Sequence, residues 1–146
     1  MTEQRPGGRV LGLDLGDARI GVAISDPGRA LAVPLGTVQT GAPHDVKAIA
    51  AMVREHGVTE VVVGHPRSMS GRAGPRARLS ERFAEALEAG LGLPVHLQDE
   101  RLSTVEADRA LRAAGAGGRA LRRAVDRSAA TVILQAWLDA HRNRAG

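Results

Sequence analysis

The sequence predicts an α/β protein with a mixed five-stranded sheet and helices on its faces. Three strand-like segments joined by short turns come first, which is the pattern of an antiparallel meander. Helical and strand-like segments then alternate, and a strand, a helix and a strand in succession require a parallel crossover. The 146 residues are expected to form one domain over 1–146, with a polar, unfolded tail at 1–7.

The stretch 9–26 organises the rest of the chain. Residues 10–15 are apolar except for Gly12 and Asp14, which suits a strand buried on both faces. The pair Gly16-Asp17 indicates a tight turn, and residues 19–25 return as the second strand. This segment therefore predicts a β-hairpin.

Turn and stop signals divide the remaining chain. A third strand over 30–39 contains Pro34, which a sheet tolerates at its edge. Helical spacing covers 44–56 and 75 to about 89, with expected apolar stripes at Val46, Ile49, Ala50 and Val53 and at Leu79, Phe83, Ala86 and Leu87. Short apolar strands are expected over 58–64 and 94–98.

Two further helices are expected near the C-terminus. Ser103 and Glu106 form a capping box that opens a helix to about residue 114. After the Gly-rich break at 115–118, one long helix is predicted from 119 or 120 to about 144. Its expected apolar stripe consists of Val125, Ala129, Val132, Ile133, Ala136 and Ala140.

Three acidic positions stand out. Asp14 lies inside an apolar strand, where a carboxylate needs compensation by an arginine, backbone N–H groups or a metal ion; it could alternatively tie down the Gly16 turn. Asp99 and Glu100 follow the last strand directly, and Asp126 lies on the margin of the last helix's buried face. Each could also be an ordinary surface or turn residue.

Together the acids favour a metal site. The carboxyl ends of parallel strands meet at one edge of a sheet, so Asp14, Glu100 or Asp99, and Asp126 can converge there. Clustered carboxylates repel one another unless cations intervene, and an all-oxygen ligand set selects Mg²⁺ or Mn²⁺. Two such ions can activate water against a phosphodiester.

The composition is compatible with a polyanionic partner. The net charge is +4, and 19 arginines stand against one lysine, Lys47; arginine suits bidentate phosphate contacts. With Phe83 and Trp137 as its only aromatic residues, the chain is not expected to bind mainly by base stacking. Cysteine is absent, which excludes thiolate metal sites and agrees with a cytoplasmic location. No apolar run reaches transmembrane length, so no membrane association is expected.

Four segments in this order resemble the YqgF/RuvX family of bacterial ribonuclease H-like proteins, described as pre-16S rRNA nucleases and as Holliday-junction-resolvase-like. They are D-L-G-D-A-R-I-G-V-A-I-S-D at 14–26, V-V-V-G-H-P at 61–66, D-E-R-L-S-T at 99–104 and V-D-R-S-A-A-T-V-I-L-Q at 125–135. The resemblance covers about residues 8–140.

The resemblance implies a ribonuclease H-like fold and a cytoplasmic, Mg²⁺- or Mn²⁺-dependent nuclease that acts in ribosomal RNA maturation. By matching position, its catalytic and metal-binding acids fall on Asp14, Glu100 and Asp126, with Asp99 as an accessory residue. Strand alternation allows only one of Asp99 and Glu100 to face the site, and the motif favours Glu100. His65 departs from the apolar residue expected before the proline; it could touch substrate, but we expect it rather to pack in the loop.

Arginines near these motifs are candidates for nucleic-acid binding or for pairing with the acids. The candidates are Arg19, Arg67, Arg72, Arg101, Arg122 and Arg123. Arg19 and Arg101 lie within the motifs, and Arg67 and Arg72 belong to an arginine-rich stretch over 67–82. Arg122 and Arg123 belong to a second arginine cluster over 119–127. Two such runs beside one acidic site favour a nucleic-acid groove over a merely solvated face.

Alternatives to a nuclease of ribosomal RNA remain open at this point. The chain could resolve branched DNA, or bind nucleic acid or ribosomal particles without cutting. An actin-like ATPase also has D-x-G after a strand, but it needs two domains around its nucleotide. Both a monomer and a homodimer are compatible with the sequence, and a resolvase would require a dimer.

Overall fold

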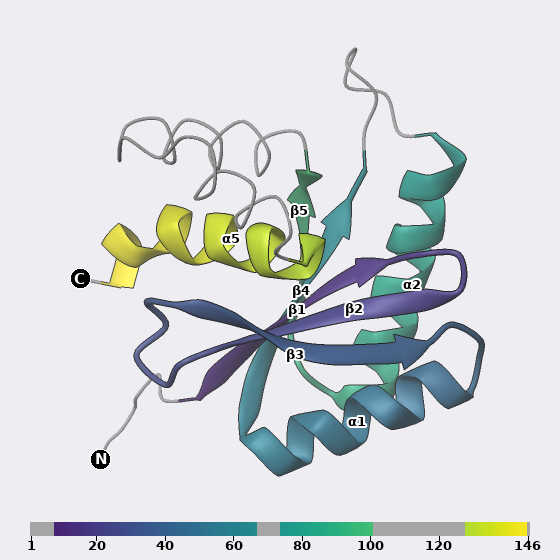
Figure 1. Cartoon of the computed structure of the whole chain (residues 1–146), viewed down its shortest axis with the longest axis horizontal. Helices are drawn as coiled ribbons and strands as arrows, with labels where there is room; N and C mark the ends of the chain where they lie inside the picture. The colour runs from purple at the N-terminus through teal and green to yellow at the C-terminus, as the bar shows by residue number, and fades with distance from the viewer. Residues whose placement is uncertain (1–7, 67–73, 101–127, 146) are drawn as a thin grey trace.

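The computed structural model describes residues 8–66, 74–100 and 128–145. Five strands form one sheet in the order β3-β2-β1-β4-β5 (Figure 1). The strands run over Arg9–Leu15 (β1), Arg19–Ser25 (β2), Ala32–Gln39 (β3), Val58–His65 (β4) and Val95–Asp99 (β5). The described helices are His44–His56 (α1), Pro75–Leu91 (α2) and Ala129–Ala145 (α5). None of these helices is long and apolar enough to cross a membrane.

The sheet is mixed, as predicted. β2 pairs antiparallel with both β1 and β3, whereas β4 pairs parallel with β1 and β5. The proline-containing strand β3 lies at the edge, and Pro34 stands opposite Ala23 at a register shift. Because β1, β4 and β5 run in the same direction, their carboxyl ends meet at one edge of the sheet.

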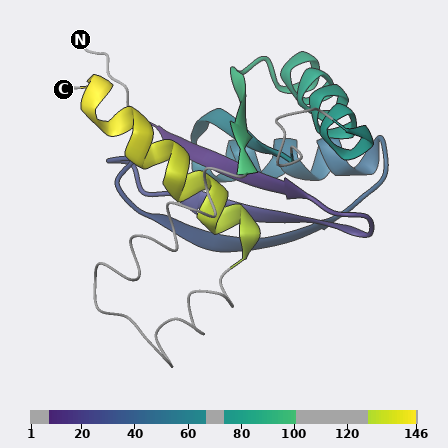
Figure 2. The ribbon, with the colours of Figure 1, turned by 90° about the horizontal axis from the view of Figure 1, so that it is seen from above.

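Helices cover both faces of the sheet (Figures 1 and 2). On one face, Ile49 of α1 and Leu87 of α2 join a core with Leu11 and Val63. On the other face, α5 packs on a second core whose members alternate with those of the first along the strands. These members are Val10, Ala23, Ala32, Val62, Ala130, Ile133, Leu134, Trp137 and Leu138. This alternation is the period-two pattern of strands buried on both faces.

Local signals define α1 and the start of β3. α1 spans the predicted residues, and Gly57 ends it with φ +67°, the left-handed conformation that glycine adopts readily. β3 begins at Ala32 rather than at residue 30. The reason is that Asp26 Oδ1 accepts hydrogen bonds from the N–H groups of Ala30 and Leu31 at 2.8 and 2.9 Å, which holds both residues in the preceding turn.

The predicted buried stripe of α2 was wrong in part. Leu79 is 50% exposed and Ala86 is exposed, while Phe83 is half-buried. The fully buried positions of this helix are instead the small residues Ala77, Ser80 and Ala84, together with the predicted Leu87. Small side chains allow the helix to lie close to the sheet, so size rather than hydrophobicity selects the packed face.

The predicted long C-terminal helix also required correction. Ser128 lies outside α5, and its Oγ accepts a hydrogen bond from the N–H of Thr131 at 3.2 Å, as an N-cap serine does. The buried face is then set by Ala130, Leu134 and Trp137, whereas Ala129 and Ala140 are exposed. The tail 1–7, the predicted helix 103–114, the break 115–118 and residues 119–127 lie outside the described residues.

Three glycines form the sheet surface beneath α5. A Cβ on Gly12 would lie 2.6 Å from Leu134 Cβ and 3.2 Å from the Ala130 carbonyl oxygen, and one on Gly64 would lie 2.6 Å from Ile133 Cδ1. At Gly21 the nearest atoms are 3.7 and 3.9 Å away, which is ordinary contact. α5 therefore approaches β1 and β4 closely because no side chains separate them.

We predict that Gly12→Ala lowers the free energy of unfolding by about 1–3 kcal/mol, because the added methyl group overpacks a contact with helix backbone. Gly21→Ala is the matched control and should change it by no more than about 0.5 kcal/mol. Urea unfolding of the two variants measures the difference. Equal effects at both positions would show that α5 does not depend on the bare surface of β1.

Candidate active site

The carboxyl edge of the sheet brings two of the predicted acids together. Asp14 is the penultimate residue of β1, and Glu100 directly follows β5. β4 lies between these strands and ends there with Gly64 and His65. The parallel crossovers thus join positions that are 86 residues apart in the sequence.

Both acids lie on the face of the sheet that α5 covers. A Cβ on Gly64 would lie 2.8 Å from Glu100 Oε2, so this carboxylate packs directly over the glycine, next to Ile133 of α5. Gly21 stands opposite Asp14 on β2, and a Cβ on Gly21 would lie 3.9 Å from Asp14 Cβ and 3.7 Å from Ala130 Cβ. Asp14 therefore also faces α5.

The same geometry separates Glu100 from Asp99. Val95 of β5 packs against the core on the α1 and α2 face, and Asp99, four residues later in the strand, belongs to that face by alternation. Asp99 also pairs in register with His65, which is buried on that side. Of the two neighbouring acids, only Glu100 shares a face with Asp14.

The described cations offset the negative charge of Asp14 and Glu100 only in part. Burial raises the pKa of Asp14 above its ordinary value, and the charge of Arg76 lowers it only in part. Burial also raises the pKa of Glu100, and the nearby Asp14 and Asp99 carboxylates raise it further, whereas Arg76 and His65 act in the opposite direction. Two partly buried carboxylates that repel each other favour binding of positive charge.

The donor chemistry fits a hard divalent cation. Asp14 and Glu100 offer only oxygen atoms, the ligands that Mg²⁺ and Mn²⁺ prefer. Within residues 8–66, 74–100 and 128–145, no group of three histidines or acids has the geometry of a complete metal site. The third predicted acid, Asp126, lies outside the described residues, and the described chain resumes two residues later at Ser128.

The structure does not support the alternative that Asp14 holds the turn at Gly16. The N–H of Gly16 donates to the carbonyl of Arg19 at 3.0 Å, and the Gly16 carbonyl accepts from Thr40 Oγ1 at 3.1 Å. The turn is thus held by other groups, and Asp14 is not needed for it.

Among the predicted arginines, only Arg19 falls within the described residues. It opens β2 on the exposed side of the turn that follows Asp14. The other predicted arginines lie outside the described residues: Arg67, Arg72, Arg101, Arg122 and Arg123.

Two features at this edge did not follow from the sequence. Arg76, in the first turn of α2, is the arginine whose charge acts on both Asp14 and Glu100, although the sequence indicated it only as part of an arginine-rich stretch. His65, which we expected to pack in the loop, is instead the last residue of β4. It is 3% exposed, and its Nε2 lies 2.7 Å from Glu81 Oε2 of α2. Pro75 at the first helical position was the available signal that Arg76 belongs to the helix start.

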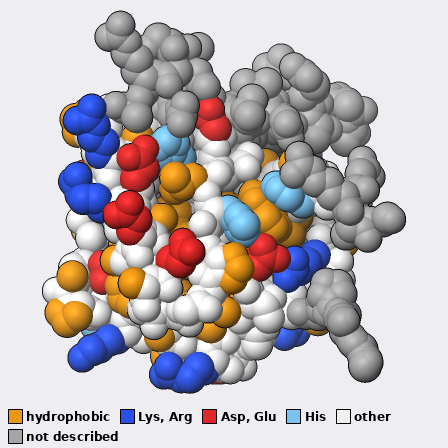
Figure 3. Space-filling view, turned by 180° about the vertical axis from the view of Figure 1, so that it is seen from behind, with side chains coloured by type: hydrophobic (Ala, Val, Ile, Leu, Met, Phe, Trp, Pro, Cys, Tyr) orange, Lys and Arg blue, Asp and Glu red, His pale blue; other side chains and the backbone are white. Residues whose placement is uncertain are grey.

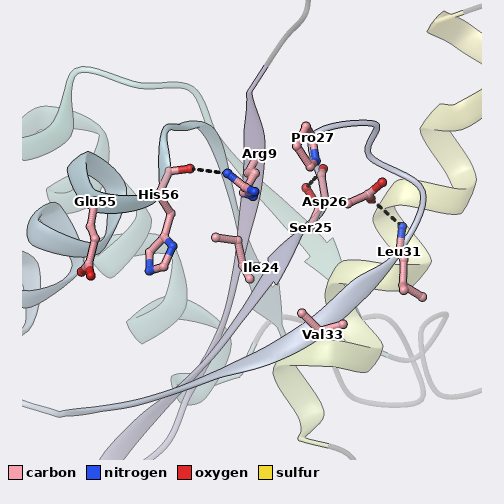
Figure 4. Close-up of a pocket in the computed structure, with 9 residues that line it drawn as sticks. All are labelled: Arg9, Ile24, Ser25, Asp26, Pro27, Leu31, Val33, Glu55 and His56. Atoms are coloured by element: carbon pink, nitrogen blue, oxygen red, sulfur yellow. Dashed lines mark hydrogen bonds between the residues drawn. The ribbon is translucent and has the colours of Figure 1, made fainter.

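A separate hollow lies at the opposite end of the sheet (Figure 4). Arg9, Ile24, Asp26, Leu31 and His56 are among its lining residues. Backbone N–H groups, Leu31 first, stabilise the Asp26 carboxylate and lower its pKa, so this acid serves the β2–β3 turn. The hollow is thus remote from the acidic pair and carries a turn rather than a cluster of acids.

Comparisons with known proteins agree with this geometry. The family model of RuvX, described as Holliday junction resolvase, matches residues 8–140. A relative from Anaeromyxobacter dehalogenans named "Putative pre-16S rRNA nuclease" is 51% identical over 132 residues, which are 90% of this chain and 96% of the relative. A relative of the same name from Chloroflexus aggregans is 47% identical over 135 residues, 92% of this chain and 95% of its own.

A solved structure supports the fold. RuvC of T. thermophilus, in complex with a Holliday junction substrate, superposes with a TM-score of 0.56 at 16% identity, over 93% of this chain and 96% of RuvC. At this identity the likeness concerns the fold alone. The fold and the relatives together define the class as ribonuclease H-like nucleases. Within that class, the chain belongs to the RuvX family.

We predict that Asp14→Asn stabilises the protein at neutral pH. Because the folded-state pKa of Asp14 lies above its ordinary value, folding stability falls as pH rises through that interval, and the loss persists above it. The neutral amide removes this loss, and each kcal/mol recovered raises Tm by about 2–4 °C. Thermal unfolding followed by circular dichroism at pH 7 and near pH 3 measures the effect.

The stabilisation by Asp14→Asn should shrink towards pH 3, where the native carboxyl is protonated in both states. Asp17→Asn, an exposed carboxylate three residues later in the turn, is the control and should leave Tm unchanged. A Tm of Asp14→Asn at or below that of the wild type at pH 7 would contradict the burial argument.

Proposed function

We propose that this chain is a metal-dependent endonuclease that hydrolyses phosphodiester bonds of precursor 16S ribosomal RNA in the cytoplasm. The observation that carries the proposal is the placement of Asp14 and Glu100 on one face of the carboxyl edge, with pKa values raised by burial and, for Glu100, by the neighbouring acids. The names of the RuvX-family relatives supply the substrate.

In this proposal Asp14, Glu100 and Asp126 hold Mg²⁺ or Mn²⁺. Asp126 is included because its motif matches the family. It precedes α5 in the sequence, and Ala130 at the start of that helix packs beside Gly21 and over Gly12 at the strand of Asp14. Asp99 is an accessory acid on the opposite face, close enough to raise the pKa of Glu100.

The ions would supply Lewis-acid stabilisation of the negative charge at the reacting phosphate. The chain's own residues determine the shape and position of the site that would bind the phosphate. Gly64 lets the Glu100 carboxylate lie against the sheet, and α5 closes the site on one side through Ile133. Partial burial by these groups lowers the local dielectric and so strengthens the electrostatic stabilisation of the transition state.

Nucleic acid would reach this edge along the arginines. Arg19 is exposed on the turn beside Asp14. The other proposed contacts lie in the sequence between β4 and α2 or between β5 and α5: Arg67, Arg72, Arg101, Arg122 and Arg123. On the side seen in Figure 3, acidic and basic side chains are mixed among the described residues. A face of mixed charge does not attract a polyanion as a whole, so we favour the carboxyl edge with Asp14 and Glu100, rather than the side seen in Figure 3, as the nucleic-acid interface.

Branched DNA is the second candidate substrate, because the family model carries the description Holliday junction resolvase. Cutting a two-fold symmetric junction would require a homodimer, whereas cleavage of ribosomal RNA requires only a monomer bound to RNA or to a ribosomal particle. A homodimer in solution would therefore favour branched DNA as the substrate, and a monomer would favour ribosomal RNA.

We predict that the purified chain cuts one of these substrates only with Mg²⁺ or Mn²⁺, and that Asp14→Asn abolishes the cutting. A precursor ribosomal RNA fragment and a four-way DNA junction are incubated in parallel with each ion or with EDTA, and the products are resolved on denaturing gels. If the wild type binds RNA but cuts neither substrate, the chain is a binding factor. Cutting by Asp14→Asn at the wild-type rate would exclude the acidic site.

Loss of a group that only supports a metal ligand typically lowers the rate by about 10–100-fold. We further predict that Asp99→Asn lowers the cleavage rate within that range, whereas Glu100→Gln lowers it by more. The reason is that only Glu100 shares a face with Asp14. Single-turnover rates of the two neighbouring variants provide the comparison. The reverse order would place Asp99, not Glu100, in the site.

A further inference from the structure

Arg76 occupies a particular place among the described cations. It lies in the first turn of α2, the helix that the Glu81–His65 contact holds against the end of β4, beside Gly64 and Glu100. Its charge acts on both Asp14 and Glu100, yet among the described residues its guanidinium makes no ion pair or hydrogen bond with either acid. The residue is exposed. An arginine that lies beside two acids without pairing with them has its N–H donors available for a ligand at the same edge.

The backbone at Arg76 is held firmly. The neighbouring Ala77 is fully buried, and the buried Ser80 donates its hydroxyl to the Arg76 carbonyl at 3.2 Å. One further residue along α2, Glu81 meets the buried His65 of β4 at 2.7 Å. The Glu81 side chain is 41% exposed, whereas that of His65 is 4% exposed, so the pair ties the helix surface to the end of the strand beside Gly64.

These contacts connect the helix that carries Arg76 to the strand that lies beside the acidic pair. β4 carries both Gly64, over which Glu100 packs, and His65, which fixes α2 through Glu81. The position of the Arg76 backbone is therefore set by the same strand that positions Glu100. A functional group on such a packed helix is placed more accurately than one on a loop.

We propose that Arg76 is a catalytic residue that contacts the phosphate being cleaved, and that the His65–Glu81 pair positions it. This inference rests on the proposed nuclease function. In the hydrolysis, the oxygen of water forms a bond to phosphorus, the bond to the leaving ribose oxygen breaks with its electron pair, the water loses a proton and the leaving oxygen gains one. Negative charge grows on the non-bridging oxygens, and the planar guanidinium donates hydrogen bonds to them.

The full chain is compared with Arg76→Ala and Arg76→Lys, using the labelled precursor RNA fragment and the four-way junction. With protein in saturating excess, Arg76→Ala should cut bound substrate about 100-fold or more slowly than the wild type, as loss of a transition-state donor does. Its slope of log affinity against log salt concentration should also fall by about one contact. Lysine should restore the salt slope but not the full rate, because it lacks the planar fork.

Arg54→Ala is the matched control, since Arg54 is an exposed helical arginine on α1 and lies outside the site. It should change neither the rate nor the slope. A wild-type rate for Arg76→Ala at saturation overturns the catalytic role. Asp14→Asn distinguishes the two claims: if it cuts, or if the wild type does not, the proposed function fails. If the proposed function fails, the salt dependence of binding still tests whether Arg76 contacts a phosphate. An unchanged slope in Arg76→Ala would exclude that contact, whereas a lowered slope would support it.

A double-mutant cycle tests the positioning pair. Glu81→Gln should slow cleavage about 10-fold in the wild type but not in the Arg76→Ala background, because the pair acts through Arg76. Glu85→Gln, an exposed acid one turn further along α2, is the control and should have no effect in either background. An equal slowing by Glu81→Gln in both backgrounds would show that the pair supports the fold rather than Arg76.

Discussion

The close contact of α5 with β1 and β4 is the constraint on which the rest of the structure depends. It exists because Gly12 and Gly64 present no side chains: added methyl groups there would meet Leu134 and Ile133 of α5 at 2.6 Å. Gly64 also leaves room for Glu100, whose carboxylate oxygen lies 2.8 Å from where a Cβ would be. One strand position thus serves both the packing of a helix and the placement of an acid.

That packing has an electrostatic consequence. The helix and sheet that enclose the edge take Asp14 and Glu100 partly out of water, and burial is the largest cause of their raised pKa values. Arg76 offsets part of this cost, but it is not paired with either acid. An arrangement that reduces stability is expected where function requires it, and a cation bound between such carboxylates would reverse the cost. The packing of α5, the placement of the two acids and the proposed chemistry therefore depend on one another.

Local signals made most of the fold predictable, whereas side-chain packing did not follow from them. Helix α1, the stop at Gly57, the edge position of Pro34 and the mixed sheet were all confirmed, because turn chemistry and periodicity depend on neighbouring residues. The buried face of α2 was partly wrong because hydrophobicity pointed to Leu79, while close helix–sheet packing selected the small residues. For the site, the sequence indicated the acids and alternation narrowed the choice to one of Asp99 and Glu100. The place of Arg76 depends on a crossover and on the contact of the buried His65 with the half-exposed Glu81, which no local pattern encodes.

The most direct test of the proposed metal site is whether Asp14 and Glu100 bind a divalent cation together. Binding of Mn²⁺ to the full chain can be followed by electron paramagnetic resonance, which detects the free ion without any need for substrate. We expect that the wild type binds Mn²⁺ and that Asp14→Asn and Glu100→Gln each weaken binding strongly, whereas Asp17→Asn does not. Unchanged Mn²⁺ binding by the Asp14→Asn, Glu100→Gln double variant would contradict the claim that these two carboxylates form the metal site.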